Sequence, residues 1–211
     1  MSLTLGLSIM RKALNLKATP LFLAASSSGQ HDFVSFLIEL GSDVNEAAFN
    51  ETKKEQITPL VAAAKENHLA TVQVLLANGA KPDNCDQVLW HSCSEDDRLE
   101  MVRTLLDAGA KCDLKKTIAT SYQNYTGLTR LMSLVLMGNG AVIDVFSKCI
   151  DRDTVNYAAC GRLENQFEFN ITAAWLASES GLTDILDTLL ELGADANAGA
   201  VTREGVTLSC L

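Results

Sequence analysis

The chain has 211 residues, 47% of them apolar and 20% charged, so it is long and apolar enough to bury a substantial core. With 26 acidic against 17 basic residues, the formal net charge is −9 at pH 7. Because phosphates would repel such a surface, the composition argues against binding to nucleic acid or to an anionic membrane, and a neutral or basic protein surface is a more favourable partner.

Residues 1–18 are expected to form a capping helix. The apolar residues that begin at Leu3 stop at Arg11-Lys12, and this run is shorter than the ~20 residues that a membrane span needs. Basic residues do not precede the run and no convincing cleavage site follows it, so a secretory signal peptide is not indicated. Four residues could cover the apolar flank of the helices that follow, namely Ile9, Ala13, Leu14 and Leu16.

From residue 19 onward one pattern recurs, and its clearest copy runs from Thr58-Pro59-Leu60 through three alanines to Leu75-Leu76 and Gly79. A Thr hydroxyl can cap the first N–H groups of a helix, and Pro at the first helical position loses only a donor that has no partner there. The Val and Leu positions give a second helix an apolar stripe, and Gly can close that helix in the left-handed conformation. Each unit is therefore predicted to be a helix, a turn, a second helix and an extended finger.

The other copies are expected to begin near residues 19, 88, 129 and 172. The copy near Val88 has lost its Thr and Pro, and the copy at Thr129 has Asp151-Arg152-Asp153 in place of the glycine turn. A partial sixth copy is expected to start a helix at Thr207, which the chain end at Leu211 cuts short. That ending favours either a frayed cap or a fragment of a longer protein.

This unit resembles the ankyrin repeat, which has a period of about 33 residues and a T-P-L-H-x-A helix start. The resemblance covers nearly everything from Thr19 to Leu211. It implies an all-α fold, an ankyrin-repeat solenoid of stacked helix-turn-helix units with extended finger loops, formed by residues 19–211 as one domain. The His of the family motif survives only as His91; the other copies have Phe22, Val61, Met132 and Trp175.

The resemblance also implies a protein or peptide partner, bound across the fingers and the exposed ends of the first helices, with no enzymatic activity and no cofactor. The positions that correspond to these helix ends are Lys65, Glu66, Glu95, Asp96, Leu136 and Met137. Apolar residues at the last two positions indicate either extra packing under the neighbouring loops or a patch for a partner. The acidic pair suits either a solvated helix start or a site for a cation or a basic peptide.

Three fingers are longer than the family's usual finger, over residues 46–57, 114–128 and 157–171. Long ordered connections in a compact array are usually functional or disordered. Because Tyr and Arg are common interface anchors, the candidates here are Tyr122, Tyr125, Arg162, Phe167 and Phe169. The two Phe residues alternate with polar residues as a strand does, so packing within the loop itself is the open alternative.

Catalytic and metal-binding arrangements are not indicated. His91 and Cys93 are two residues apart on one predicted helix and cannot face each other, and His31 and His68 have no carboxylate or Cys at ligand spacing. The six cysteines are interpreted as reduced thiols in the cytoplasm, with the nucleus or a host-cell cytosol as alternatives. The chain is predicted to be a monomeric scaffold, adaptor or host-directed effector; the alternative is the recognition or regulatory part of a longer enzyme.

Overall fold

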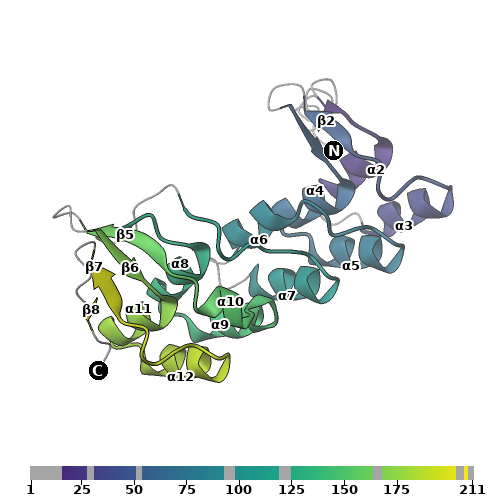
Figure 1. Cartoon of the computed structure of the whole chain (residues 1–211). Helices are drawn as coiled ribbons and strands as arrows, with labels where there is room; N and C mark the ends of the chain where they lie inside the picture. Colours follow the sequence, from purple (N-terminus) through teal and green to yellow (C-terminus); the bar gives the residue numbers. More distant parts are fainter. Residues whose placement is uncertain are drawn as a thin grey trace. The chain divides into compact units, whose positions relative to one another are not determined.

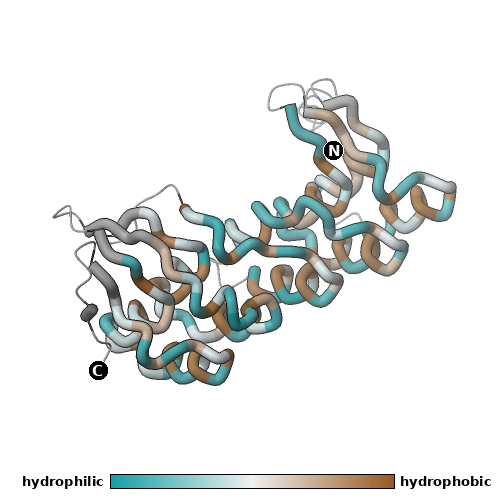
Figure 2. The backbone as a smooth tube through the Cα atoms, in the orientation of Figure 1, coloured by the Kyte–Doolittle hydropathy of each residue, from teal (hydrophilic) through white to brown (hydrophobic). Residues whose placement is uncertain are grey.

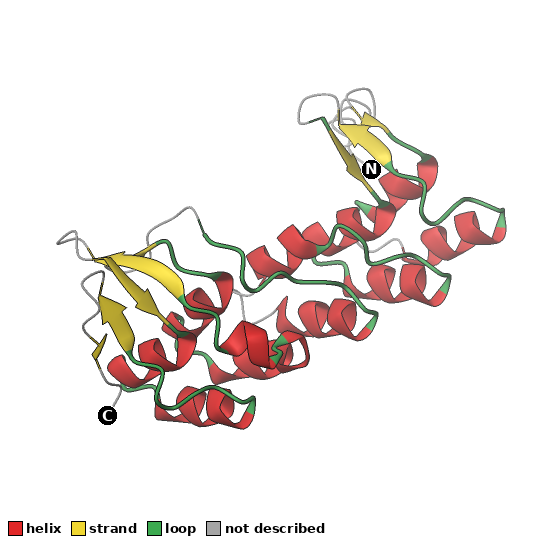
Figure 3. Cartoon of the chain, in the orientation of Figure 1, coloured by secondary structure: helices red, strands yellow, loops and turns green. Residues whose placement is uncertain are grey.

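The computed structural model describes residues 16–27, 31–50, 54–92, 98–118, 125–163, 168–202 and 207–208. The chain divides into two compact units (Figure 1). The N-terminal unit consists of residues 1–92 and 100–111, and the C-terminal unit consists of residues 93–99 and 112–211. Both are built from short helices with strands at one end of the helix pairs (Figure 3).

Within its described residues the N-terminal unit has three successive helix pairs. They are α2 (Pro20–Ala25) with α3 (His31–Glu39), α4 (Pro59–Lys65) with α5 (Leu69–Ala77), and α6 (Asp86–Ser92) with α7 (Leu99–Asp107). The first helix α2 packs on α4, and the second helix α3 packs on α5. The pairs therefore stack in chain order, as expected from the repeats.

The C-terminal unit repeats this plan with α8 (Arg130–Leu136) and α9 (Gly140–Phe146), then α11 (Ala173–Glu179) and α12 (Thr183–Glu191). Again α11 packs on α8 and α12 packs on α9. After α9 come a 3-10 turn, Ser147–Cys149, and a short helix α10, Arg152–Val155. Asp151 caps α10, because its side chain accepts the Thr154 N–H at 2.7 Å. Hydrogen bonds with the side chain and the backbone of Thr154 lower the pKa of the Asp151 carboxyl group.

Threonine starts four of these helices in the predicted way. Each Thr has an extended backbone, and its hydroxyl oxygen accepts the backbone N–H of the residue three positions later. The donors are Phe22 to Thr19 (3.2 Å), Val61 to Thr58 (3.3 Å), Met132 to Thr129 (3.2 Å) and Trp175 to Thr172 (3.2 Å). In the copy that lacks Thr, α6 begins at Asp86, two residues before the predicted Val88, and the Cys85 carbonyl accepts the first turn's Leu89 N–H.

The first finger supplies β2 (Ala48–Asn50) and β3 (Glu55–Ile57), and these form a three-stranded antiparallel sheet with β1 (Leu16–Lys17) in the order β1-β2-β3. The predicted capping helix is wrong at residues 16 and 17, because these residues pair with β2 as a strand. Residues 1–15 lie outside the described part of the chain. Ala48 on β2 is fully buried against Phe22 of α2 and Ala62 of α4. Small and aromatic side chains thus fix this sheet to the first helices.

Three strands of the two long later fingers, β4 to β6, join two strands that follow α12 in a five-stranded antiparallel sheet of the order β4-β5-β6-β7-β8. Its strands are Tyr125–Thr126, Ala159–Leu163, Glu168–Ile171, Ala200–Thr202 and Thr207–Leu208. The helix predicted to start at Thr207 is therefore wrong: Thr207 pairs with Val201 in β8. The physical reason is that the backbone at Thr207 pairs with β7, and Thr favours extended backbone.

The core lies between the two helices of each pair and between successive pairs. Hydropathy changes sharply along the helices, with hydrophobic segments next to hydrophilic ones (Figure 2). The buried second-helix positions are those that the repeat pattern predicts, including Val34, Val72, Leu75, Val102, Leu105 and Leu189. The alanines of α4 are also buried, which allows α2 and α6 to approach it closely.

Leu75→Ala is expected to reduce the free energy of unfolding by about 2–5 kcal/mol, because a fully buried Leu leaves a cavity when it is shortened. Urea denaturation followed by circular dichroism measures this loss. Gln73→Ala, at an exposed position of the same helix, is the control and should change stability by less than about 0.5 kcal/mol. Equal midpoints for the two variants would contradict the proposed register of α5.

Candidate protein-interaction surface

The two longest fingers meet in one sheet. Strand β5 of the fourth finger pairs on one side with β4 of the third finger and on the other with β6. The register places Tyr125 opposite Leu163, and Gly161 opposite Phe169. We call this five-stranded sheet of the C-terminal unit the finger sheet (β4 to β8).

The finger sheet brings together candidates that are far apart in the sequence. Tyr125, Arg162 and Phe169 lie on three neighbouring strands, and Arg162 stands opposite Glu168 in the β5–β6 register. The strand predicted by the alternation around Phe169 is confirmed as β6. Tyr122 and Phe167 lie outside the described residues.

The helix-end candidates divide into exposed and buried residues. Lys65 ends α4 and Glu66 follows as its C-cap, and both are exposed. Leu136 is only 7% exposed at the end of α8, and Met137 is half-buried. Of the two interpretations of the apolar pair, packing under the neighbouring loops or a patch for a partner, packing fits Leu136, which exposes little surface. Glu95 and Asp96 lie outside the described residues.

The first finger has a basic side chain over an aromatic one. The Lys54 Nζ atom lies 6.0 Å from the centroid of the Phe49 ring, within the range of a cation–π contact. Lys54 has a φ of 55°, a left-handed conformation between β2 and β3. This contact holds a positive charge beside the sheet of the N-terminal unit.

Two asparagine side chains link consecutive repeats. The Asn45 amide nitrogen donates to the Gly79 carbonyl at 3.1 Å, and its oxygen accepts the Lys81 N–H at 2.8 Å. In the C-terminal unit, Asn156 bonds in the same way to the Gly193 carbonyl (2.9 Å) and the Asp195 N–H (2.7 Å). Each Asn therefore joins the segment after one helix pair to the closing turn of the next.

Sequence reasoning missed these bridges. Asn45 is the fourth residue after the closing glycine Gly41, where the next two copies have Asp83 and Asp113. An Asn at that position, able to donate and accept at once, was the available signal. Asn156 had no such signal, because its repeat has no closing glycine.

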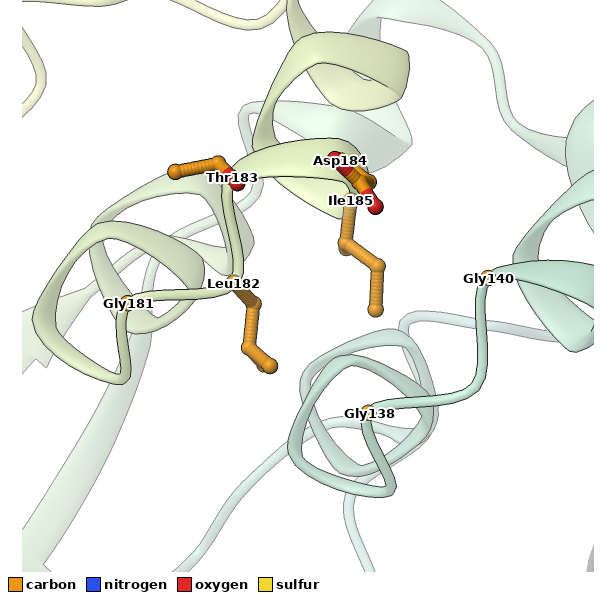
Figure 4. A pocket seen from close by; sticks show the side chains of 7 residues that line it. All are labelled: Gly138, Gly140, Gly181, Leu182, Thr183, Asp184 and Ile185. Carbon is orange, nitrogen blue, oxygen red and sulfur yellow. The ribbon is translucent and has the colours of Figure 1, made fainter.

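The C-terminal unit has a small cavity of about 220 Å³ between two helix-to-helix turns (Figure 4). One turn contains Gly138 and Gly140, and the other runs from Gly181 to Ile185. The side chains of Leu182 and Ile185 point towards the first turn. The volume is below the roughly 300–1,000 Å³ of typical ligand pockets, and most of the lining residues are exposed, so this is a shallow surface hollow, smaller than a cofactor site usually is.

Two described cysteines have thiols with raised pKa values. Burial, together with the nearby Asp83 carboxylate, raises the pKa of the Cys85 thiol to about 11, and burial also raises the pKa of Cys149. A nucleophilic cysteine needs a lowered pKa, so neither thiol is activated at neutral pH. Within the described ranges, no three His, Cys, Asp or Glu side chains are placed to hold a metal ion. Cys93, considered with His91 from the sequence, lies outside these ranges.

A family model described as "Ankyrin repeats (3 copies)" matches residues 21–116. These residues are therefore similar to ankyrin repeats. The fowlpox virus protein "Putative ankyrin repeat protein FPV031" is 31% identical over 134 residues, which cover 62% of this chain and 36% of the viral protein. The chain thus spans about a third of the length of that relative.

Among solved structures, the human ASB11 ankyrin repeat domain is similar with a TM-score of 0.47 at 20% identity, over 86% of this chain and 72% of that chain. The all-α ankyrin fold class predicted from the repeated pattern is confirmed. Ankyrin repeats are generally protein–protein interaction modules, typically without enzymatic activity. No helix in the described part of this chain is long and apolar enough to cross a membrane.

Asn156→Ala is expected to reduce the free energy of unfolding by about 1–2 kcal/mol, because it removes two hydrogen bonds between consecutive helix pairs. Thermal or urea denaturation measures the change. Asn78→Ala is the control, since the Asn78 amide donates at 2.8 Å to Val74 of its own helix. A loss in the control as large as that in Asn156→Ala would mean that the inter-repeat bridge has no special weight.

Stability is expected to fall between about pH 9 and pH 11 through Cys85. Its pKa is 9.0 in the reference state and about 11 when folded, so the folded protein keeps this proton longer. The contribution of about 2–3 kcal/mol is fully present below pH 9 and is lost as the pH rises to 11. Urea midpoints across this range measure it, with Cys85→Ala as the control: parallel pH profiles for both proteins would contradict the buried, protonated thiol.

Proposed function

We propose that this chain is a non-enzymatic interaction module that binds a protein or peptide partner through the finger sheet. The partner would lie across the strands, with contacts to the exposed ends of the first helices, and the module would act as a scaffold, adaptor or effector-type protein. Its place of action would be a reducing compartment such as the cytoplasm.

The observation that carries the proposal is the joining of two long fingers into one antiparallel sheet. A finger that only connects two helix pairs needs few residues, yet the fingers of residues 114–128 and 157–171 are long, and their strands β4 and β5 pair with each other. Ordered loops held by a rigid scaffold are the usual position of binding residues. The helix pair α8–α9 and the pair α11–α12 provide that scaffold.

Residue type and charge indicate the nature of the partner. Tyr125 and Arg162 are on adjacent strands, and both types bury much area when they anchor an interface. The net charge of −9 favours a neutral or basic partner surface and would speed its approach at low salt. A protein or peptide with a basic surface is therefore the preferred ligand class.

The test begins with affinity capture from a source lysate and continues with calorimetry on the purified partner. Tyr125→Ala combined with Arg162→Ala is expected to weaken binding by about 2 kcal/mol or more, as loss of interface anchors does. Asp187→Ala is the control, because Asp187 is exposed on the second helix α12 and lies off the sheet. A melting temperature unchanged within about 2 °C shows that both variants fold.

Retention of full affinity by the Tyr125→Ala, Arg162→Ala protein would contradict the proposal. So would a loss of binding confined to Asp187→Ala, since that result would place the partner on the second helices. Salt dependence gives a further check, because a basic partner of an acidic chain should bind less tightly as the ionic strength rises.

A further inference from the structure

The second helix of the first pair has an exposed apolar stripe. Phe33 and Phe36 on α3 are 48% and 51% exposed, and Leu40, just after the helix, is 67% exposed. Their spacing of three and four residues places them on one face of the helix. The two Phe rings stack with centroids 6.3 Å apart. We call Phe33, Phe36 and Leu40 the α3 stripe.

The position of Phe33 is buried in other repeats of this chain. Phe33 stands eight residues before the closing glycine Gly41, and the matching residues before later glycines are Thr71, Met101 and Ile185. These three are 2%, 1% and 3% exposed. The position therefore belongs to a flank that the ankyrin architecture ordinarily covers.

What covers this flank in the later repeats is a helix. The helix that carries Thr71 is α5, and it packs on α3; the helix that carries Ile185 is α12, and it packs on α9 (Figure 1). Among the described residues no helix precedes α2, so α3 has no such neighbour on the stripe from this part of the chain. This flank of α3 therefore corresponds to a surface on which a neighbouring helix packs in the later repeats.

The charges around the stripe are acidic. Asp32 and Glu39 are exposed on α3, Asp43 is exposed just beyond it, and the sequence from residue 18 to residue 50 contains no Lys or Arg. A second copy of a chain with a net charge of −9 would meet like charge there, and an anionic membrane would be repelled in the same way. A ligand with basic residues beside its apolar face is complementary.

We propose that the α3 stripe is a docking site for an amphipathic helix of a protein partner with basic residues flanking its apolar face. Apolar side chains spaced at i, i+3, i+4 and i+7 pack against the Phe33 and Phe36 rings and Leu40. Lys or Arg residues of the partner face Asp32 and Glu39. This site is on α3 of the N-terminal unit, separate from the finger sheet, so either proposal can fail without the other.

The test uses a fluorescent synthetic peptide of about 18 residues, roughly five helical turns, with Leu at that spacing and Lys on both flanks. Fluorescence anisotropy with the full chain measures its binding. A second peptide has Glu in place of every Lys. The Lys peptide is expected to bind at least about tenfold more tightly than the Glu peptide, and its affinity should fall with added salt.

Two double variants and one control locate the site. Phe33→Ser with Phe36→Ser is expected to weaken the Lys peptide by about tenfold or more, because the apolar anchors are lost. Asp32→Asn with Glu39→Gln is expected to weaken the Lys peptide and to leave the Glu peptide unchanged or slightly tighter. Leu190→Ser is the control, because Leu190 is an exposed apolar residue of another second helix, α12, and it should leave the affinity unchanged.

Several results would overturn the proposal. Equal affinity for the two peptides, or equal loss in Leu190→Ser, would show non-specific adhesion. Concentration-dependent dimers in sedimentation that disappear in the Phe33→Ser, Phe36→Ser protein would assign the stripe to a second copy. A fall of more than about 5 °C in the melting temperature of that variant would show that the chain covers its own stripe, because exposed Phe residues contribute little to stability.

Discussion

The junction between finger and helix is the constraint on which the rest of this structure depends. At Thr19, Thr58, Thr129 and Thr172 the backbone is still extended, while the hydroxyl oxygen already accepts the N–H of the third residue of the helix. Strand and helix therefore meet at a fixed residue, which sets both where the finger ends and how the first helix is aligned. The burial of Thr172 and Thr129 makes the junction part of the core.

Stacking follows from that fixed start. Small residues let the first helices pack closely, and the second helices bury Val and Leu residues between successive pairs. Asn45 and Asn156 link the segments that follow two helix pairs to the closing turn of the next pair. Where a second helix precedes, as α3 precedes α5 and α9 precedes α12, the flank position is buried; on α3, before which the described residues have no second helix, the matching flank exposes two Phe rings. The apolar position that is part of the core in later repeats is thus exposed at α3, where we propose that a basic helix docks.

The fold was predictable wherever the chemistry was local. Thr-Pro starts, the alanine runs and the closing glycines each act within a few residues, and their helices appeared as expected. The errors came from long-range pairing: nothing near Leu16 or Thr207 indicates β2 or β7, whose hydrogen bonds make those residues strands. The same limit applied to the site. Tyr125, Arg162 and Phe169 were found as residue types, but their shared sheet depends on strand register, and the burial of Leu136 depends on its neighbours in space.

The long fingers contribute strands to one ordered sheet and are not loops that only connect helices. Hydrogen exchange measured by mass spectrometry tests it directly, because amides paired between strands exchange only when the structure opens. Peptides that contain β5 and β6 are expected to be protected to nearly the same degree as those of α11. Exchange of the β5 and β6 peptides at the rate of an unstructured chain, with α11 still protected, would contradict the claim.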